Sequence, residues 1–178
     1  MKTAPILALI ILSVFFSAQA LATDNAIEDV LDAKVSEVVE SLRDEFAMEH
    51  EEARGLFIHE LNDNNTIMAM AIFTIEGFSR GNNYSQFLAV FLYPAKKSIL
   101  HKEDIKLLDV KSIGGKGERE IDNEEVRIAQ EGNHVGILLN TKEYGPNDPM
   151  CCPSVKGNVI YSIVPAVGGK LKEEKEGT

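Results

Sequence analysis

Two long apolar segments in the middle of the chain restrict the folds that are open to it. Residues Ile67–Ile75 and Tyr84–Tyr93 contain almost no charge, and the short polar segment Gly77–Asn83 separates them. A strand with one face in water alternates apolar and polar residues, whereas a strand covered on both faces has a continuous apolar sequence. We therefore expect two central strands of one sheet, and we expect other parts of the protein to cover both faces of that sheet.

The first covering element is predicted from residues 24–52. Apolar residues recur there at steps of three and four, as in an amphipathic helix: Ile27, Val30, Leu31, Val35, Val38, Val39, Leu42 and Phe46. Asn25 with Glu28 three residues later resembles a capping box, and Gly55 is a plausible stop signal. The pattern predicts one long N-terminal helix on one face of the sheet. The other face then requires sheet curvature, a long loop or a second subunit.

The rest of the chain is typical of short strands joined by turns. Further strands are expected at Leu56–Leu61, 104–113, Glu125–Gln130, Val135–Thr141 and Val159–Val164. Gly114–Gly117 is interpreted as a hairpin turn and not as a phosphate-binding loop, because no helix follows it. Consecutive strands without intervening helices favour an antiparallel meander of about six to eight strands. The predicted fold class is therefore α+β, with a long N-terminal amphipathic helix packed on a curved antiparallel sheet.

The N-terminus resembles a secretory signal peptide over residues 1–20. Lys2 supplies the positive start, Ile6–Phe16 is apolar apart from one serine, and Ala18-Gln19-Ala20 has the small-x-small pattern of a cleavage site. We expect cleavage after Ala20, or alternatively after Ala22, and no stable membrane insertion afterwards; an uncleaved anchor is the other interpretation. This predicts a periplasmic or secreted protein with a single domain over 24–169 and a charged tail over 170–178.

Charge excludes some classes of partner. The chain has 18 basic and 28 acidic residues, and residues 24–54 alone hold 11 acidic and 3 basic ones, a net charge of −8. Nucleic-acid binding depends on basic side chains that neutralise phosphates, so no nucleic-acid partner is predicted. Anionic membrane surfaces are disfavoured for the same reason. The acidic cluster is interpreted as the solvated face of the predicted helix, with a docking face for a basic partner as the alternative.

The chain's two cysteines, Cys151 and Cys152, are adjacent in sequence and lie between Pro149 and Pro153. Adjacent Cα atoms are about 3.8 Å apart, whereas ordinary disulfides span roughly 4.4–6.8 Å, so a bridge here is expected to be strained and easily reduced. The pair could form a structural disulfide, act as a redox couple or hold a soft metal such as Cu(I). It could also be two small buried thiols in a packed loop. The copper interpretation is the weakest, so no metal site and no cofactor are predicted.

Three segments together resemble a group of small exported bacterial proteins with no assigned function, which carry an Asp-Pro-Met-Cys-Cys-Pro-Ser loop. The segments are Arg80–Ser85, Gly114–Gly117 and Tyr144–Ser154. The likeness covers most of the chain after the predicted helix. It implies export and a bacterial source, and it implies nothing about biochemical activity.

The candidate binding residues come from two loops. Gly77–Gln86 carries amide, guanidinium and phenol groups between two central strands, and such loops on a rigid sheet are common binding sites. An ordinary hairpin connection is the other interpretation. The candidate ligand-binding residues are Arg80, Asn82, Asn83, Tyr84 and Asp148, and the candidates for thiol or disulfide chemistry are Cys151 and Cys152. No catalytic residue is identified, because the histidines fit no catalytic motif.

These observations favour an exported binding or accessory module without enzymatic activity. Its partner is expected to be an unknown small molecule or an envelope protein, and oligomerisation is compatible with the sequence. The alternative is a thiol-redox or copper-handling protein that uses Cys151 and Cys152. A hydrolase whose catalytic residues meet only in the folded chain is a third and weaker hypothesis.

Overall fold

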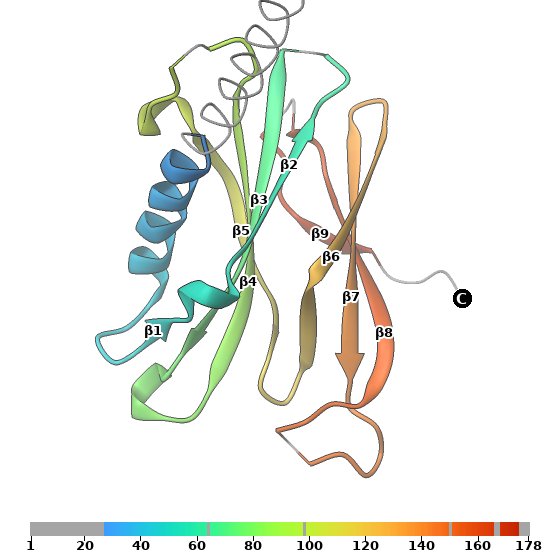
Figure 1. Cartoon of the computed structure of the whole chain (residues 1–178). Coiled ribbons are helices and arrows are strands. Elements are labelled where there is room, and N and C mark those ends of the chain that lie inside the picture. Colours follow the sequence, from blue (N-terminus) through green and yellow to red (C-terminus); the bar gives the residue numbers. More distant parts are fainter. Residues whose placement is uncertain (1–26, 64, 98, 150, 166–167, 175–178) are drawn as a thin grey trace, which may run out of the picture.

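The computed structural model describes residues 27–174 except 64, 98, 150, 166 and 167. The predicted signal peptide lies outside these residues. Within the described chain, nine strands form one antiparallel sheet, accompanied by an N-terminal helix and three 3-10 turns (Figure 1). No helix in this part of the chain combines the length and the apolar character needed to cross a membrane.

The described helix covers residues 27–42. The strands are β1 (Met48–Glu49), β2 (Gly55–Glu60), β3 (Thr66–Glu76), β4 (Tyr84–Pro94), β5 (Lys106–Gly115), β6 (Arg119–Glu131), β7 (His134–Glu143), β8 (Val155–Ile163) and β9 (Lys172–Glu174). The 3-10 turns are η1 (Glu51–Ala53), η2 (Phe78–Arg80) and η3 (Lys102–Asp104).

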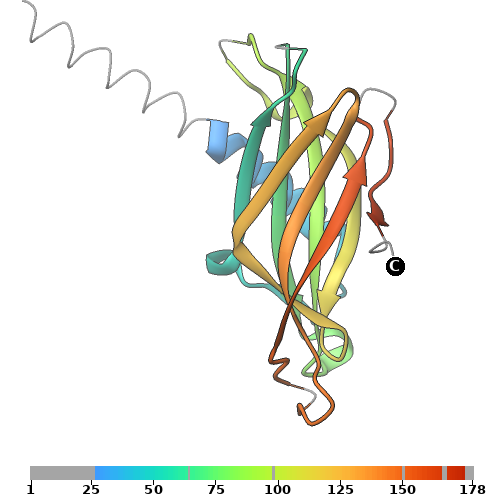
Figure 2. The same cartoon turned by 90° about the vertical axis from the view of Figure 1, so that its right-hand side faces the viewer.

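The sheet is a meander that folds back on itself. From β3 to β9 each strand pairs with the next one, and β1 and β2 both pair with β3. Between β5 and β6 the pairing is reduced to Gly115 opposite Arg119, and beyond that point the two strands diverge. The result is a first half-sheet (β1–β5) that faces a second half-sheet (β6–β9) across a shared core (Figures 1 and 2).

Both faces of β3 and β4 are buried, as their continuous apolar sequence predicts. One face packs against the second half-sheet, in a core that includes Met68, Met70, Leu88, Val90, Ile137, Leu139 and Tyr161. The other face packs against the helix, in a core that includes Leu31, Val35, Ala69, Ala71, Phe73, Ala89 and Phe91. For the face that the helix does not cover, the sequence left sheet curvature, a long loop or a second subunit as possible covers. The sheet covers this face itself, because it curves and places its second half-sheet there.

The predicted α+β class with a long helix is wrong, because the structure is mostly β and the helix ends at Leu42. Asp44 explains this end: its Oδ1 accepts the backbone N–H groups of Phe46 and Ala47, each at 2.9 Å. An aspartate that bonds the following backbone in this way competes with helical hydrogen bonding. The chain then pairs with β3 as β1 instead of continuing as helix.

Polar side chains close both margins of the folded sheet. Where β5 and β6 diverge, buried Gln86 donates to the carbonyl of Ile121 at 3.0 Å and accepts its N–H at 2.7 Å. At the other margin, the Leu171 N–H donates to Asp109 Oδ2 of β5 at 2.8 Å. Leu171 is buried and β9 pairs with β8, so ordered structure extends into the segment that was expected to be a charged tail.

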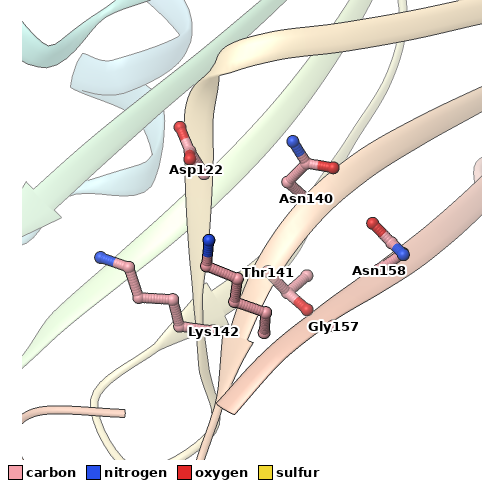
Figure 3. A pocket seen from close by; sticks show the side chains of 7 residues that line it. Asp122, Asn140, Thr141, Lys142, Gly157 and Asn158 are labelled. Atoms are coloured by element: carbon pink, nitrogen blue, oxygen red, sulfur yellow. The ribbon is translucent and has the colours of Figure 1, made fainter. Parts of the chain in front are cut away.

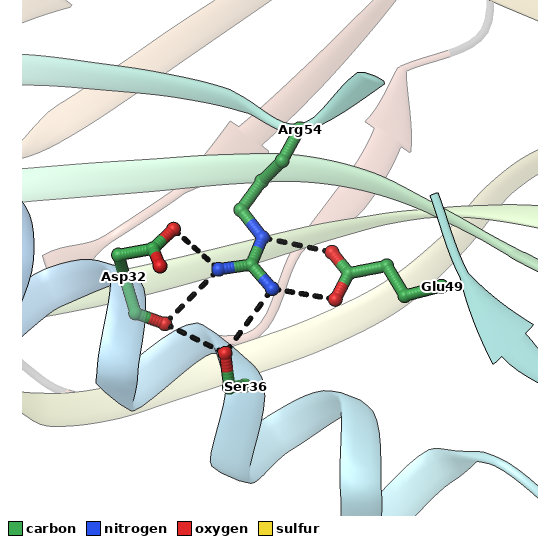
Figure 4. Close-up of polar contacts among 4 residues, drawn as sticks. All are labelled: Asp32, Ser36, Glu49 and Arg54. Atoms are coloured by element: carbon green, nitrogen blue, oxygen red, sulfur yellow. Dashed lines mark hydrogen bonds and ion pairs between the residues drawn. The ribbon is translucent and has the colours of Figure 1, made fainter. Parts of the chain in front are cut away.

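A buried arginine ties the helix to the first half-sheet (Figure 4). The Arg54 side chain is 4% exposed and the Glu49 side chain 6%. Arg54 binds the Glu49 carboxylate through two nitrogens, and it also binds the Asp32 carboxylate and Ser36 Oγ on the helix. The paired Glu49 carboxylate raises the pKa of Arg54 above its ordinary value. This two-pronged geometry fixes the helix, β1 and β2 relative to one another.

Candidate functional site

Three loops gather at one end of the molecule, which we call the loop end (the lower end in Figure 1). They are the β3–β4 loop (77–83), the β5–β6 turn (116–118) and the Cys loop (144–154). Lys116 Nζ donates to Asn82 Oδ1 at 2.7 Å, and the Gly117 N–H donates to the Tyr144 hydroxyl at 3.2 Å. The β5–β6 turn, predicted from its glycines, therefore joins the other two loops.

The β3–β4 loop has a strained backbone that neighbouring residues hold in place. Gly77, Ser79 and Arg80 have φ angles of 88°, 54° and 59°, and for a residue other than glycine such a conformation costs about 1–3 kcal/mol. The Ser79 N–H donates to Asp44 Oδ2 at 2.7 Å, and the Arg80 guanidinium lies 4.1 Å from the centre of the Phe46 ring. The Ser79 N–H, followed by that of Phe46, lowers the pKa of Asp44.

A groove of about 300 Å³, the loop-end groove, lies between this loop and β1. It is lined by Phe46, Met48, His50, Glu76, Gly77, Gly81, Asn82, Asn83 and Tyr84. Phe46 and Met48 form an apolar wall and are 37% and 69% exposed. On the polar side, His50 Nε2 lies 3.0 Å from Glu76 Oε2. The groove thus combines an exposed apolar surface with hydrogen-bonding groups.

The structure brings three of the five predicted ligand-binding residues together. Asn82, Asn83 and Tyr84 line the loop-end groove, whereas Arg80 lies over the ring of Phe46. Burial raises the pKa of the Tyr84 phenol, and nearby Tyr144 adds to the effect. The fifth residue belongs to the Cys loop, and none of the described residues of that loop lines the groove.

The Cys loop is closed by one carboxylate and carries an exposed disulfide. Cys151 and Cys152 are bonded to each other, with their Cα atoms 3.8 Å apart, and both are exposed. The interpretation as two buried thiols is therefore wrong. Asp148 Oδ2 accepts the N–H groups of Gly145 and Ser154, each at 2.8 Å, and Asp148 also accepts the Ser154 hydroxyl. The Gly145 N–H and then the Ser154 hydroxyl lower the pKa of Asp148.

Sequence reasoning missed Phe46, Met48 and His50, because they fall within the stretch predicted to be helix. The apolar stripe continues to Phe46, so the 3.6-residue period gives no sign that the helix ends at Leu42. The signal that could have found the groove is Asp44, since aspartate is unfavourable inside a helix and favours local turns.

A second depression lies on the outer face of the second half-sheet, and we call it the outer-face hollow. Its volume is about 330 Å³, and Asp122, Asn140, Thr141, Lys142, Lys156, Gly157 and Asn158 line it (Figure 3). Asp122, Asn140 and Asn158 are directly paired across β6, β7 and β8 and therefore share one face. A bulge follows at once in β6, because the next paired residue after Asp122 is Val126. Bulges re-aim side chains beside the pairs they interrupt.

Among the described residues, no group of three histidine, cysteine, aspartate or glutamate side chains is placed to hold a metal ion. Comparisons with known protein families, with curated proteins and with solved structures found no match for this chain.

Proposed function

We propose that the protein is an exported, non-enzymatic binding or accessory module whose ligand occupies the loop-end groove. The supporting observation is the strained β3–β4 loop, which Asp44 and Phe46 hold in its left-handed conformation. Strained backbone conformations of this kind concentrate at ligand-binding and switch regions. The contacts keep Asn82, Asn83 and Tyr84 on the groove without requiring the loop to rearrange.

The lining of the groove defines the chemistry of the proposed ligand. Phe46 and Met48 offer an apolar surface, and the Asn83 side chain makes no hydrogen bond to any described residue. A ligand with an apolar group next to an amide or hydroxyl matches this lining, since apolar walls with a few placed polar groups are typical of binding sites. Small molecules and peptide segments of envelope proteins both carry such a pair of groups.

The groove can be tested by NMR titration with N-acetyl-phenylalanine amide, which carries an aromatic ring and two amides. We expect shifts confined to the residues that line the groove. Asn83→Ala should weaken binding about threefold to tenfold, the effect of one or two hydrogen bonds, without changing the melting temperature. The matched control is Asn133→Ala, an exposed amide on the β6–β7 turn at the opposite end.

The proposal for the groove fails if the peptide shifts no residue of the groove, or if Asn83→Ala binds as tightly as the unsubstituted protein. A loss of binding accompanied by unfolding would show that Asn83 serves the fold and would also contradict the proposal. Export is tested separately, by the intact mass of protein recovered from the bacterial periplasm. We expect the mass of a chain cleaved after Ala20, or alternatively after Ala22, whereas recovery of the uncleaved chain from the cytoplasm contradicts export.

A second candidate function is thiol-redox chemistry, which the exposure of the disulfide favours. In that reaction a thiolate of a dithiol donor attacks one sulfur of Cys151–Cys152, which breaks the S–S bond and releases the other cysteine as a thiolate. The donor's second thiol then breaks the mixed disulfide, leaving two cysteine thiols and an oxidised donor. Cu(I) handling requires this reduction first, because thiolates, and not disulfide sulfurs, are the ligands that Cu(I) prefers.

Thiol labelling with detection by intact mass tests the redox candidate. We expect no labelled cysteine in the protein as purified, two after mild treatment with dithiothreitol, and none after reoxidation. A pair that resists dithiothreitol in the folded protein excludes redox use. Cu(I) offered against a competing chelator should bind only the reduced protein, and equal uptake by a Cys151→Ser, Cys152→Ser variant would exclude the cysteines as its ligands.

A further inference from the structure

The outer-face hollow lies on a surface that no described element covers. The helix packs on the first half-sheet, on the side away from the second half-sheet (Figure 2). Along β7, buried residues alternate with partly exposed ones, so alternate side chains point away from the core. The row formed by Asp122, Asn140 and Asn158 therefore faces outward, and Lys142 pairs with Lys156 in the next row.

Several polar groups of this hollow have unused hydrogen-bonding capacity. Lys142 is paired with Glu120 at 3.1 Å, whereas Lys156 and Asn158 make no side-chain hydrogen bond or ion pair with any described residue. Asp122 uses Oδ1 to accept the Glu124 N–H at 3.0 Å, which leaves Oδ2 available. Asn140 Nδ2 donates to Glu125 Oε2 at 3.4 Å, so the Asn140 amide keeps only its oxygen available. The Lys156 ammonium group, the Asn158 amide, the Asn140 amide oxygen and one Asp122 carboxylate oxygen thus surround one depression.

The polar groups of the outer-face hollow match some classes of ligand and disfavour others. Amides and a carboxylate can satisfy hydroxyl groups, which both donate and accept hydrogen bonds, and an ammonium group binds a carboxylate by a charge-assisted bond. A polyanion is disfavoured, because the Asp122 carboxylate lines the depression, Lys142 is already paired with Glu120, and the whole chain has a net charge of −10. None of the described residues that line the hollow has a large apolar or aromatic side chain, so a purely apolar ligand is a poorer match.

We propose that the outer-face hollow is a second binding site, independent of the loop-end groove, for a sugar that carries one carboxylate. Lys156 binds the carboxylate, while Asn140, Asn158 and Asp122 bind the ring hydroxyls. Because the hollow is open and none of the described residues that line it offers an aromatic ring on which a sugar could stack, its affinity for a single sugar is expected to be weak, on the order of millimolar.

Three chemically matched probes test the proposal by NMR: methyl β-D-glucuronide, its neutral counterpart methyl β-D-glucoside, and acetate. We expect the glucuronide to shift the side-chain amides of Asn140 and Asn158 and to bind more tightly than either of the others. Lys156→Met should weaken glucuronide binding by about 1.5-fold to fivefold, the range of an exposed ion pair, and leave glucoside binding unchanged. Asn158→Ala should weaken the binding of both sugars.

The matched control is Lys172→Met, which removes an exposed lysine on β9, outside the hollow, and should change neither affinity. Equal affinity for acetate and the glucuronide would reveal a nonspecific anion patch and would overturn the proposal. Glucuronide binding that Lys156→Met leaves unchanged, or shifts that fall outside the hollow, would overturn it as well. Because these variants leave the loop-end groove intact, the two proposed sites can fail separately.

Discussion

The two half-sheets share a core but differ in what covers their outer faces. The first half-sheet carries the helix, so β3 and β4 are buried on both sides, with Phe73 and Phe91 fully inaccessible. The outer face of the second half-sheet has no such cover in the described chain, and Ile160 on β8 is 43% exposed. The burial of their strands differs accordingly: most of β3 is buried without interruption, whereas buried and partly exposed residues alternate along β7.

This difference determines which side chains pack inside the protein and which remain accessible to a ligand. Nearly every side chain of β3 and β4 packs against another part of the protein, so on these two strands ligand-accessible groups occur mainly at the ends. On the second half-sheet some outward-facing residues, such as Lys156 and Asn158, are polar and lie along the strands themselves, where a ligand can reach them. The two proposed sites follow this division, one at the loop end and one on an open face.

The largest expected effect comes from a substitution in the core between the first half-sheet and the helix. Phe73→Ala removes a fully buried ring whose centre lies 5.5 Å from that of Phe87, and we expect a loss of about 3–5 kcal/mol of unfolding free energy. Ile160→Ala on the open face should cost about 1 kcal/mol or less, because its side chain is partly in water already. Urea denaturation measures both. Equal losses would contradict the proposed difference between the two faces.

The next largest loss of unfolding free energy is expected from breaking a buried ion pair, and an exposed ion pair serves as the comparison. Arg54→Met leaves the nearly inaccessible Glu49 carboxylate without its partner, and breaking a buried pair costs about 3–5 kcal/mol. Lys142→Met breaks the exposed pair with Glu120, which is worth about 0–1 kcal/mol. Chemical denaturation of the two variants measures the difference. A small effect of Arg54→Met would show that Arg54 does not fasten the helix.

A smaller effect is expected at the junction between the half-sheets. Gln86→Leu keeps the size of the side chain but leaves the N–H and carbonyl of Ile121 without their partner. Unsatisfied buried groups cost about 1–3 kcal/mol. The control Gln130→Leu removes an amide that accepts the exposed Asn62 N–H and should cost less. Thermal unfolding distinguishes the two, and faster amide exchange at Ile121 in Gln86→Leu would confirm the cause.

The smallest effects concern the two loop carboxylates and depend on pH. Asp44 and Asp148 both have lowered pKa values in the folded protein, so the stability they contribute is present above about pH 4, the ordinary aspartate pKa, and is lost as the pH falls through the folded-state pKa. Asp44→Asn and Asp148→Asn should therefore melt earlier at neutral pH, and the deficit should shrink in acid.

The control for these loop variants is Asp29→Asn on the exposed helix surface, which should lower the melting temperature less than either of them at neutral pH, because the Asp29 side chain accepts no hydrogen bond from a described residue. We expect Asp44→Asn to have the larger effect of the two, because Asp44 holds both the helix end and the strained β3–β4 loop. A deficit that stays constant across the pH range would show that the carboxylate charge is not the cause.

Some features of the fold and of the candidate site could be predicted from the sequence, and others could not. The covered central strands, the antiparallel meander and the turn at Gly114–Gly117 were all predictable, because apolar continuity and glycine placement act locally. The helix end was not predicted, since Asp44 overrides an apolar period that continues to Phe46. Asn82, Asn83 and Tyr84 were predicted as neighbours on one loop, but the groove partners Met48 and His50 belong to a strand and a turn that only pairing with β3 creates.

The amino-acid sequence by itself determined which strands must be buried on both faces, where the turns fall, and that the adjacent cysteines can bond within the chain only to each other. These properties depend on residue type, local spacing and the length of the backbone between neighbours. The tertiary structure alone decided that the sheet folds over to supply its own second cover, and which polar side chains meet at the loop end and across β6, β7 and β8. Those outcomes depend on strand register and on contacts between residues far apart in the chain, which local pattern does not encode.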